Sequence, residues 1–181
     1  MKIIKHRFIN HRINPETEIL ILGTFNPDTE KNEADFFYGR RRNYLWQILS
    51  DIYKTDNLKF APKKEKLLFM EKMKIDFIDL IRAVKVEEGQ ENNYKDDYID
   101  GKVIEWNDVP AKMKALKNLR KIALTRKTLH GIPNMKKRIE EIERYCRKND
   151  IVFRRLTTPA RHPNYYGAEK YDEWFDFFLK D

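Results

Sequence analysis

Four short apolar runs along the chain are separated by longer segments in which apolar residues recur at helical spacing. The runs comprise residues 19–22, 75–78, 121–124 and 151–153. They lack the strict alternation of a half-exposed strand, and continuous apolar runs are typical of parallel strands that are buried on both faces. We therefore expect these runs to form the four strands of one parallel sheet.

The segments between the runs show the periodicity of amphipathic helices. Apolar residues at three- and four-residue spacing predict helices over residues 44–52, 62–73, 109–116, 133–148 and 171–179. Asn43 and Asp108 stand where N-cap residues are expected. Because strands alternate with helices, the pattern predicts an α/β fold, a three-layer α/β/α sandwich around a central four-stranded parallel sheet. The length of 181 residues fits a single domain over residues 1–181.

Two segments do not follow either periodicity. Residues 26–42 are polar, then aromatic, then basic, and residues 87–101 are acidic and rich in Asn and Asp. We expect both to be long loops or lids, and such loops often carry function in compact domains.

The charge of the chain favours a polyanionic partner. Lys and Arg total 37 against 29 Asp and Glu, which gives a formal net charge of +8. Release of counterions from phosphates favours the binding of basic proteins to nucleic acids. The alternative interpretation is a soluble protein that happens to be basic, since net charge does not determine function.

The single cysteine and the apolar stretches limit the class of protein. Cys146 cannot form an internal disulfide, and we expect it to be a buried packing thiol on a helix. The four histidines have no partners at metal-ligand spacing, so we expect no metal and no cofactor. The N-terminus has no apolar signal-peptide region, and the longest apolar stretch, residues 19–22, is too short to span a bilayer. These features predict a cytoplasmic protein with no membrane association.

Three clusters could carry chemistry. Gly23 to Asp28 follow the first predicted strand, and ligands of such folds bind beyond the carboxyl ends of the strands. Residues 35–46 place consecutive aromatics before three arginines, which suits base stacking and phosphate binding. Residues 156–164 follow the last predicted strand and contain a His-Pro pair. The alternative for each cluster is structural: a turn, core aromatics beside a solvated basic turn, and a loop histidine bonded to the backbone.

Taken together, these clusters resemble the uracil-DNA glycosylase superfamily. The matching segments read ILILGTFNPD, FFYGRRRNYLWQIL and LTTPARHPN, in the order and spacing of that superfamily over nearly the whole chain. Residues 76–80 fit a middle strand of the family pattern. The branches most similar to this chain are the hypoxanthine-DNA glycosylases and the mismatch-specific uracil/thymine glycosylases.

The resemblance implies catalytic roles for a few polar residues. Asn26, within the water-activating loop from Gly23 to Pro27, would orient the attacking water, or Asn43 of the basic turn would do so. Asp28 is an acidic alternative for that role. His162 would stabilise the departing base.

The resemblance also implies residues that bind the base and the DNA. Tyr38 would stack under a flipped base, in a pocket completed by Gly23, Thr24 and Phe25. The DNA would be held by the basic turn and by the last loop, through Arg40, Arg41, Arg42, Arg161 and Asn164.

The hypothesis that follows is a monofunctional DNA glycosylase of base excision repair. It would flip uracil or hypoxanthine out of DNA and hydrolyse the N-glycosidic bond as a monomer, without a cofactor. A first alternative is a glycosylase-fold protein that binds nucleic acid or a nucleotide without cleaving it. A second is an unrelated α/β domain. The glycosylase-fold hypotheses require Asn26, Tyr38, Asn43 and His162 to line one cleft.

Overall fold

The predicted sheet lies at the centre of the computed structural model, which describes residues 1–160 and 167–180. Its strands are β2 (Ile19–Gly23), β3 (Ile75–Asp79), β6 (Lys121–Leu124) and β7 (Val152–Arg155), all parallel, in the order β3-β2-β6-β7. All four predicted strands are thus confirmed. The segment over residues 76–80, expected to be a middle strand, instead contributes β3, which lies at the edge of the sheet. β3 pairs with β2, and the other neighbour of β2 is β6.

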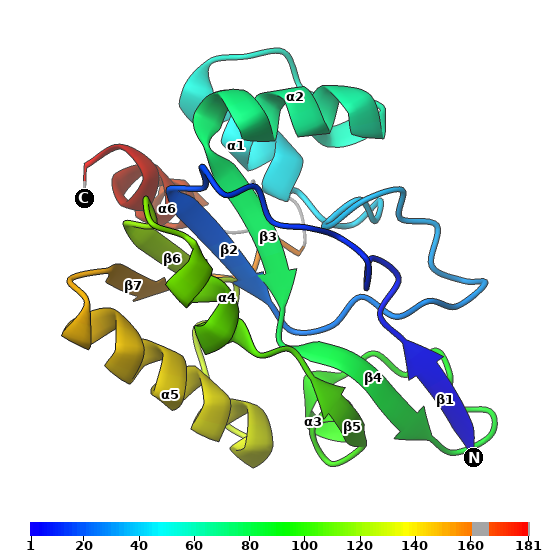
Figure 1. Cartoon of the computed structure of the whole chain (residues 1–181). Helices are drawn as coiled ribbons and strands as arrows, with labels where there is room; N and C mark the ends of the chain where they lie inside the picture. The colour runs from blue at the N-terminus through cyan, green and yellow to red at the C-terminus, as the bar shows by residue number, and fades with distance from the viewer. Residues whose placement is uncertain (161–166, 181) are drawn as a thin grey trace.

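Helices cover both faces of this sheet (Figure 1). They are α1 (Leu45–Tyr53), α2 (Lys63–Met73), α3 (Asp96–Asp100), α4 (Val109–Ala115), α5 (Pro133–Lys148) and α6 (Gly167–Leu179), with a short 3-10 helix, η1 (Leu58–Phe60). The five predicted helices are confirmed within a few residues. The acidic segment 87–101 is not a loop throughout, since its last residues form α3.

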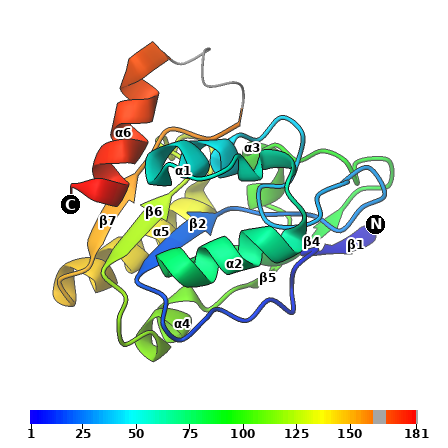
Figure 2. The same ribbon diagram turned by 90° about the horizontal axis from the view of Figure 1, so that it is seen from above.

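The alternation of side chains along the strands explains the three layers. Ile19 and Ile21 of β2 pack with α1, α2 and α6, whereas Leu20 and Leu22 pack with α4 and α5. Successive side chains of a strand point to opposite faces, so a continuous apolar run fills two cores at once. The three-layer α/β/α sandwich is therefore confirmed (Figures 1 and 2).

A second, smaller sheet extends to one side of the parallel sheet (Figure 1). It consists of β1 (Lys2–Lys5), β4 (Ile81–Val86) and β5 (Val103–Trp106), which are antiparallel in the order β1-β4-β5. The sequence pattern did not predict it, because β1 and β5 are short and mostly exposed. Only Leu80 separates β4 from β3, and its amide donates to the carbonyl of Gly23 (3.0 Å).

Two local expectations have different outcomes. Asp108 caps α4 as expected, because its carboxylate accepts the amide hydrogen of Ala111. The N-cap of α1 is Tyr44 and not Asn43. Asn43 lies one residue earlier and accepts the amide hydrogen of Leu45 (3.0 Å). Within the described residues, no helix has the length and apolar character needed to cross a bilayer.

Candidate active site

A cavity of about 490 Å³ opens at the carboxyl edge of the parallel sheet. Residues at or after the carboxyl ends of all four parallel strands line it, as expected for ligand sites in this class of fold. The loop between β2 and α1 and the acidic segment before β5 complete its wall. The lining side chains with polar or aromatic character include Thr24, Phe25, Asn26, Tyr38, Arg40, Asn43, Asp79, Tyr94, Asp96, Thr125, Arg126 and Thr157.

The floor of the cavity is a close contact between Gly23, Asp79 and Tyr38. A Cβ atom on Gly23 would lie 2.1 Å from Asp79 Oδ1 and 2.6 Å from the Tyr38 hydroxyl. No side chain fits in that space, so glycine is required there because two polar side chains closely approach the backbone. The floor therefore presents a carboxylate and a phenol beside each other.

A buried histidine holds Asp79 in place. His6 Nε2 lies 2.8 Å from Asp79 Oδ2, and both side chains are almost fully buried. The amide of Phe8 donates to His6 Nδ1 (3.0 Å), so the neutral ring carries its proton on Nε2 and donates it to the carboxylate. The contact fixes the orientation of Asp79 and leaves Oδ1 on the cavity side.

Tyr38 is held with its hydroxyl at the floor. Its backbone has φ of +55°, an uncommon conformation for a residue with a side chain, and its hydroxyl lies 3.1 Å from Thr125 Oγ1. Burial raises the pKa of Tyr38 well above its usual value, and the negative charge of Asp79 adds to this effect. The phenol therefore keeps its proton at neutral pH.

A second carboxylate also lines the cavity. Asp96, at the start of α3, accepts a hydrogen bond from Arg126 Nη1 at 2.5 Å. Burial raises the pKa of Asp96, while the charge of Arg126 and a hydrogen bond from Thr24 act in the other direction. The acidic segment 87–101 thus contributes directly to the cavity.

Arg40 belongs to the basic turn, and its side chain lines the cavity. Its guanidinium stacks on the Tyr94 ring at 4.5 Å, and its Nε donates to Asn32 Oδ1 at 3.2 Å. Its Nη2 atom is buried and has no hydrogen-bond partner in the described residues. Burial lowers the pKa of Arg40, which nevertheless stays charged because the ordinary value is far above neutrality.

The basic turn and the loop after β7 meet at the edge of the cavity. Asn43 forms an isolated antiparallel bridge with Ala160, and the amide of Tyr44 donates to the carbonyl of Pro159 (2.9 Å). Two clusters that are far apart in the sequence therefore form one rim, as their shared sheet edge predicts.

The structure brings most of the candidate residues together. Seven of them line the cavity: Gly23, Thr24, Phe25, Asn26, Tyr38, Arg40 and Asn43. Asp28 does not line it. The Asp28 side chain is exposed and forms an ion pair with Arg7 at 3.1 Å, because the chain turns outward after Pro27. Arg41 and Arg42 are exposed beside the cavity rather than in it. Arg161, His162 and Asn164 lie outside the described residues.

The cavity residues that sequence reasoning missed include Asp79, Tyr94, Asp96 and Arg126. Two of them carried a usable signal. Asp79 ends β3 and Arg126 closely follows β6, so both lie at the edge already identified from the first and last strands. Tyr94 and Asp96 carried no such signal, because the fold of an irregular segment is set by its tertiary contacts.

Comparison with known proteins supports the fold. No family model matches the chain, and no curated protein matches it. The structure is similar to a solution NMR structure described as a putative uracil DNA glycosylase from Methanosarcina acetivorans. The TM-score is 0.63 with 21% identical residues, over 92% of this chain and 91% of that one. A likeness at this identity establishes a shared architecture.

Proposed function

We propose that this protein is a DNA glycosylase that removes a flipped, deaminated base, uracil or hypoxanthine, by hydrolysis of the N-glycosidic bond. The observation that carries the proposal is the composition of the cavity at the carboxyl edge. It combines a fixed carboxylate, a protonated phenol and side-chain amides with exposed arginines just outside. The fold shared with a protein named as a glycosylase supports the same conclusion.

The cavity suits a nucleobase rather than a stretch of duplex. Its volume of about 490 Å³ lies in the range of small-molecule sites, and its lining mixes aromatic faces with hydrogen-bonding groups. A base inside a duplex is inaccessible to such a cavity, so it must be extruded, at a cost of a few kcal/mol. Stacking on an aromatic ring such as that of Tyr38 offsets part of that cost.

Asp79 is the group best placed to assist water attack. The amide oxygens of Asn26 and Asn43 already accept hydrogen bonds, from Asn32 and from the amide of Leu45. Asp79 Oδ1 faces the cavity, whereas its Oδ2 is held by His6. In the proposed reaction, the water oxygen bonds to C1′ as the bond from C1′ to the base nitrogen breaks. The water proton passes to the Asp79 carboxylate, and the electron pair leaves with the base.

The same carboxylate has a second role in this scheme. Cleavage of a glycosidic bond passes through an oxocarbenium-like sugar, by analogy with glycoside hydrolysis. A fixed negative charge in a cavity shielded from water stabilises that cation more than a mobile charge in solution does. The roles implied for Asn26 and Asn43 in orienting water and for His162 in stabilising the departing base stay predictions.

A strand-cleavage assay tests the proposal. Labelled oligonucleotides with uracil or hypoxanthine, paired with each base or single-stranded, are incubated with the protein and treated with alkali. We expect cleavage at the modified base, with lower rates for Asn26→Ala, Asn43→Ala and His162→Ala. DNA binding without base release from any substrate would contradict the proposal and favour the alternative of a non-catalytic nucleic-acid-binding protein.

A further inference from the structure

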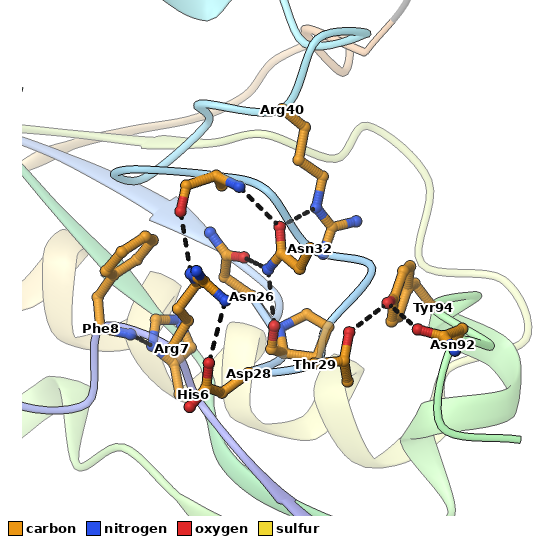
Figure 3. Close-up of polar contacts among 12 residues, drawn as sticks. His6, Arg7, Phe8, Asn26, Asp28, Thr29, Asn32, Arg40, Asn92 and Tyr94 are labelled. Atoms are coloured by element: carbon orange, nitrogen blue, oxygen red, sulfur yellow. Dashed lines mark hydrogen bonds and ion pairs between the residues drawn. The ribbon is translucent and has the colours of Figure 1, made fainter. Parts of the chain in front are cut away.

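Asn32 lies at the centre of a buried hydrogen-bond chain next to the cavity (Figure 3). Its side chain is 2% exposed. Its Nδ2 donates to Asn26 Oδ1 and to the carbonyl of Pro27, both at 2.6 Å. Its Oδ1 accepts from Arg40 Nε at 3.2 Å and from the amide of Ala34 at 3.3 Å. All the hydrogen-bonding atoms of this amide are therefore in use on the protein side.

The partners of Asn32 allow its amide only one orientation. Arg40 Nε and the amide of Ala34 can only donate, so they must face the oxygen of Asn32. The carbonyl of Pro27 can only accept, so it must face the nitrogen. If the Asn32 amide were rotated by half a turn, its nitrogen would face the donors Arg40 Nε and the Ala34 amide, and its oxygen would face the Pro27 carbonyl. These hydrogen bonds would be lost.

The orientation of Asn32 determines that of Asn26. Because the nitrogen of Asn32 points to Asn26, the atom that Asn26 presents to it must be the oxygen. The Asn26 amide nitrogen then has no hydrogen-bond partner among the described residues, although the residue is 6% exposed and lines the cavity. Asn26 thus offers the cavity a donor rather than an acceptor.

Arg40 adds a second donor to the same wall. Nε is bonded to Asn32 and the guanidinium plane is stacked on Tyr94, which leaves Nη2 buried without a partner in the described part of the chain. Tyr94 is itself held, since its hydroxyl donates to Asn92 and accepts from Thr29, each at 2.6 Å (Figure 3). A buried donor left unpaired is costly, so Arg40 Nη2 favours a ligand that carries an acceptor, and the free Asn26 amide nitrogen can donate to the same ligand.

We propose that Asn32 is a positioning residue that orients Asn26 and Arg40 as donors to a carbonyl oxygen of the bound base. This inference rests on the proposed function and specifies its substrate class as bases with a ring carbonyl where the parent base has an amino group. Uracil and hypoxanthine have that oxygen, whereas cytosine and adenine place an N–H donor there. A site built to pair with one group rejects the analogue that lacks it, because its buried polar atoms stay unpaired.

Asn26→Asp is the decisive variant. The carboxylate still accepts the hydrogen bond from Asn32, but its second oxygen now faces the cavity as an acceptor in place of the amide donor. If Asn26 oriented the attacking water instead, this variant would keep or raise the cleavage rate, since a carboxylate can also take a proton. Asn32→Asp is the second variant. It keeps the contact with Arg40 and cannot donate to Asn26. Glu33→Gln, at the exposed neighbouring position, is the matched control.

The readout is base preference in binding, which does not require cleavage. Fluorescence anisotropy measures the dissociation constants of oligonucleotides carrying 2′-fluorinated deoxyuridine, deoxycytidine, deoxyinosine or deoxyadenosine, which resist hydrolysis. We expect the native protein and Glu33→Gln to bind the uracil and hypoxanthine probes at least 10-fold more tightly than the amino-base probes. Both aspartate variants should lose that preference, and Glu33→Gln should retain its affinity for an unmodified oligonucleotide.

The outcomes separate the inference from the proposed function. A native protein without preference for the carbonyl bases, or an Asn26→Asp variant that keeps the preference, overturns the inference even if cleavage occurs. A preference that Asn26→Asp abolishes, in a protein that cleaves no substrate, supports the inference and overturns the proposed function. Thermal melts show whether Asn32→Asp is folded, and Asn26→Asp decides the result if it is not.

Discussion

Individual residues of the cavity are set by contacts that leave them little freedom. Asp79 is held by a neutral histidine, Tyr38 by Thr125, and Gly23 is the contact point between them. Each of these side chains is fixed before a ligand arrives, so binding requires little reorganisation. The two predictions at this scale concern a residue that the proposed reaction uses and one that it does not.

Asp79→Asn should lower the cleavage rate by about 10²–10⁴-fold, the usual contribution of a general base. The substitution keeps the size of the side chain, and its amide can remain near His6, so the fold and the melting temperature should change little. Single-turnover rates with a uracil oligonucleotide check the prediction. A rate within twofold of the native value would remove Asp79 from the proposed mechanism.

Cys146 should make the protein less stable at alkaline pH. Burial raises the pKa of this thiol from 9.0 to about 12. The native thiol therefore keeps its proton where the unfolded one loses it. Its stabilising contribution is complete below pH 9.0 and is lost as the pH rises through about 12. At most, the free energy of unfolding falls by about 1.4 kcal/mol per pH unit in this window.

Urea unfolding of the native protein and Cys146→Ala between pH 8 and 11, with reductant, measures this effect. The variant should show a shallower decline, although it is less stable at pH 8 because a buried side chain is shortened. Tyr53, whose pKa burial raises to about 12, titrates in both proteins. Parallel declines would show that Cys146 does not titrate on unfolding.

At the scale of elements, the loop after β7 and the short helix α3 make hydrogen bonds that position the basic turn and the helix α5. The isolated bridge from Asn43 to Ala160 fastens the basic turn to the loop after β7. The helix α3 supplies a cap to α5, since Asp100 Oδ2 accepts from the amide of Asn134 (2.9 Å) and Oδ1 from that of Met135 (2.7 Å). A carboxylate at a helix N-terminus satisfies free amides and complements the helix dipole.

Asp100→Ala should destabilise the protein by about 1–3 kcal/mol, because it leaves buried amides at the start of α5 without acceptors. Asp97→Ala is the matched control, since Asp97 lies on the same helix, is exposed and, among the described residues, bonds only the amide of its neighbour Tyr98. Urea denaturation compares the two variants. Equal free energies of unfolding for the two variants would mean that water accepts the hydrogen bonds of the α5 amides as well as the Asp100 carboxylate does.

At the scale of the whole molecule, the cavity and the exposed arginines share one edge of the sheet. Asn43 lines the cavity, and Arg41 and Arg42 directly precede it with exposed side chains. Arg40, which belongs to the cavity wall, is distinct from them. In the proposed function, a DNA strand that delivers a base to the cavity would pass these two cations.

The double variant Arg41→Ala and Arg42→Ala should weaken DNA binding and lower the slope of log K against log salt by about 1.8 for duplex DNA, about 0.9 for each lost phosphate contact. Replacement of Arg147 and Lys148, at the last turn of α5, by Ala removes the same charge elsewhere. Titrations at several salt concentrations compare the pairs. An unchanged slope in the first variant would place the DNA away from the basic turn.

The hydrophobic pattern by itself determined the layers of this protein. Four predominantly apolar runs and five amphipathic segments were sufficient, because burial on both faces removes the alternation of a strand and burial on one face imposes the period of a helix. The edge of the ligand cavity also followed, since parallel strands end together. Gly23 and Asn26 were found in this way, whereas Tyr38 and Asn43 were implied by the resemblance to the uracil-DNA glycosylase superfamily.

Only the tertiary structure decided which polar groups face the cavity. The pairing of His6 with Asp79 joins residues 73 positions apart, and the orientation of Asn26 depends on Asn32 and on the hydrogen bond that Arg40 donates to it. The antiparallel sheet and the place of Tyr94 and Asp96 were likewise set by contacts distant in sequence. The period of apolar residues in a sequence indicates which side chains are buried. It does not indicate hydrogen-bond partners, because these come from segments that are distant in sequence and are brought together only by the fold.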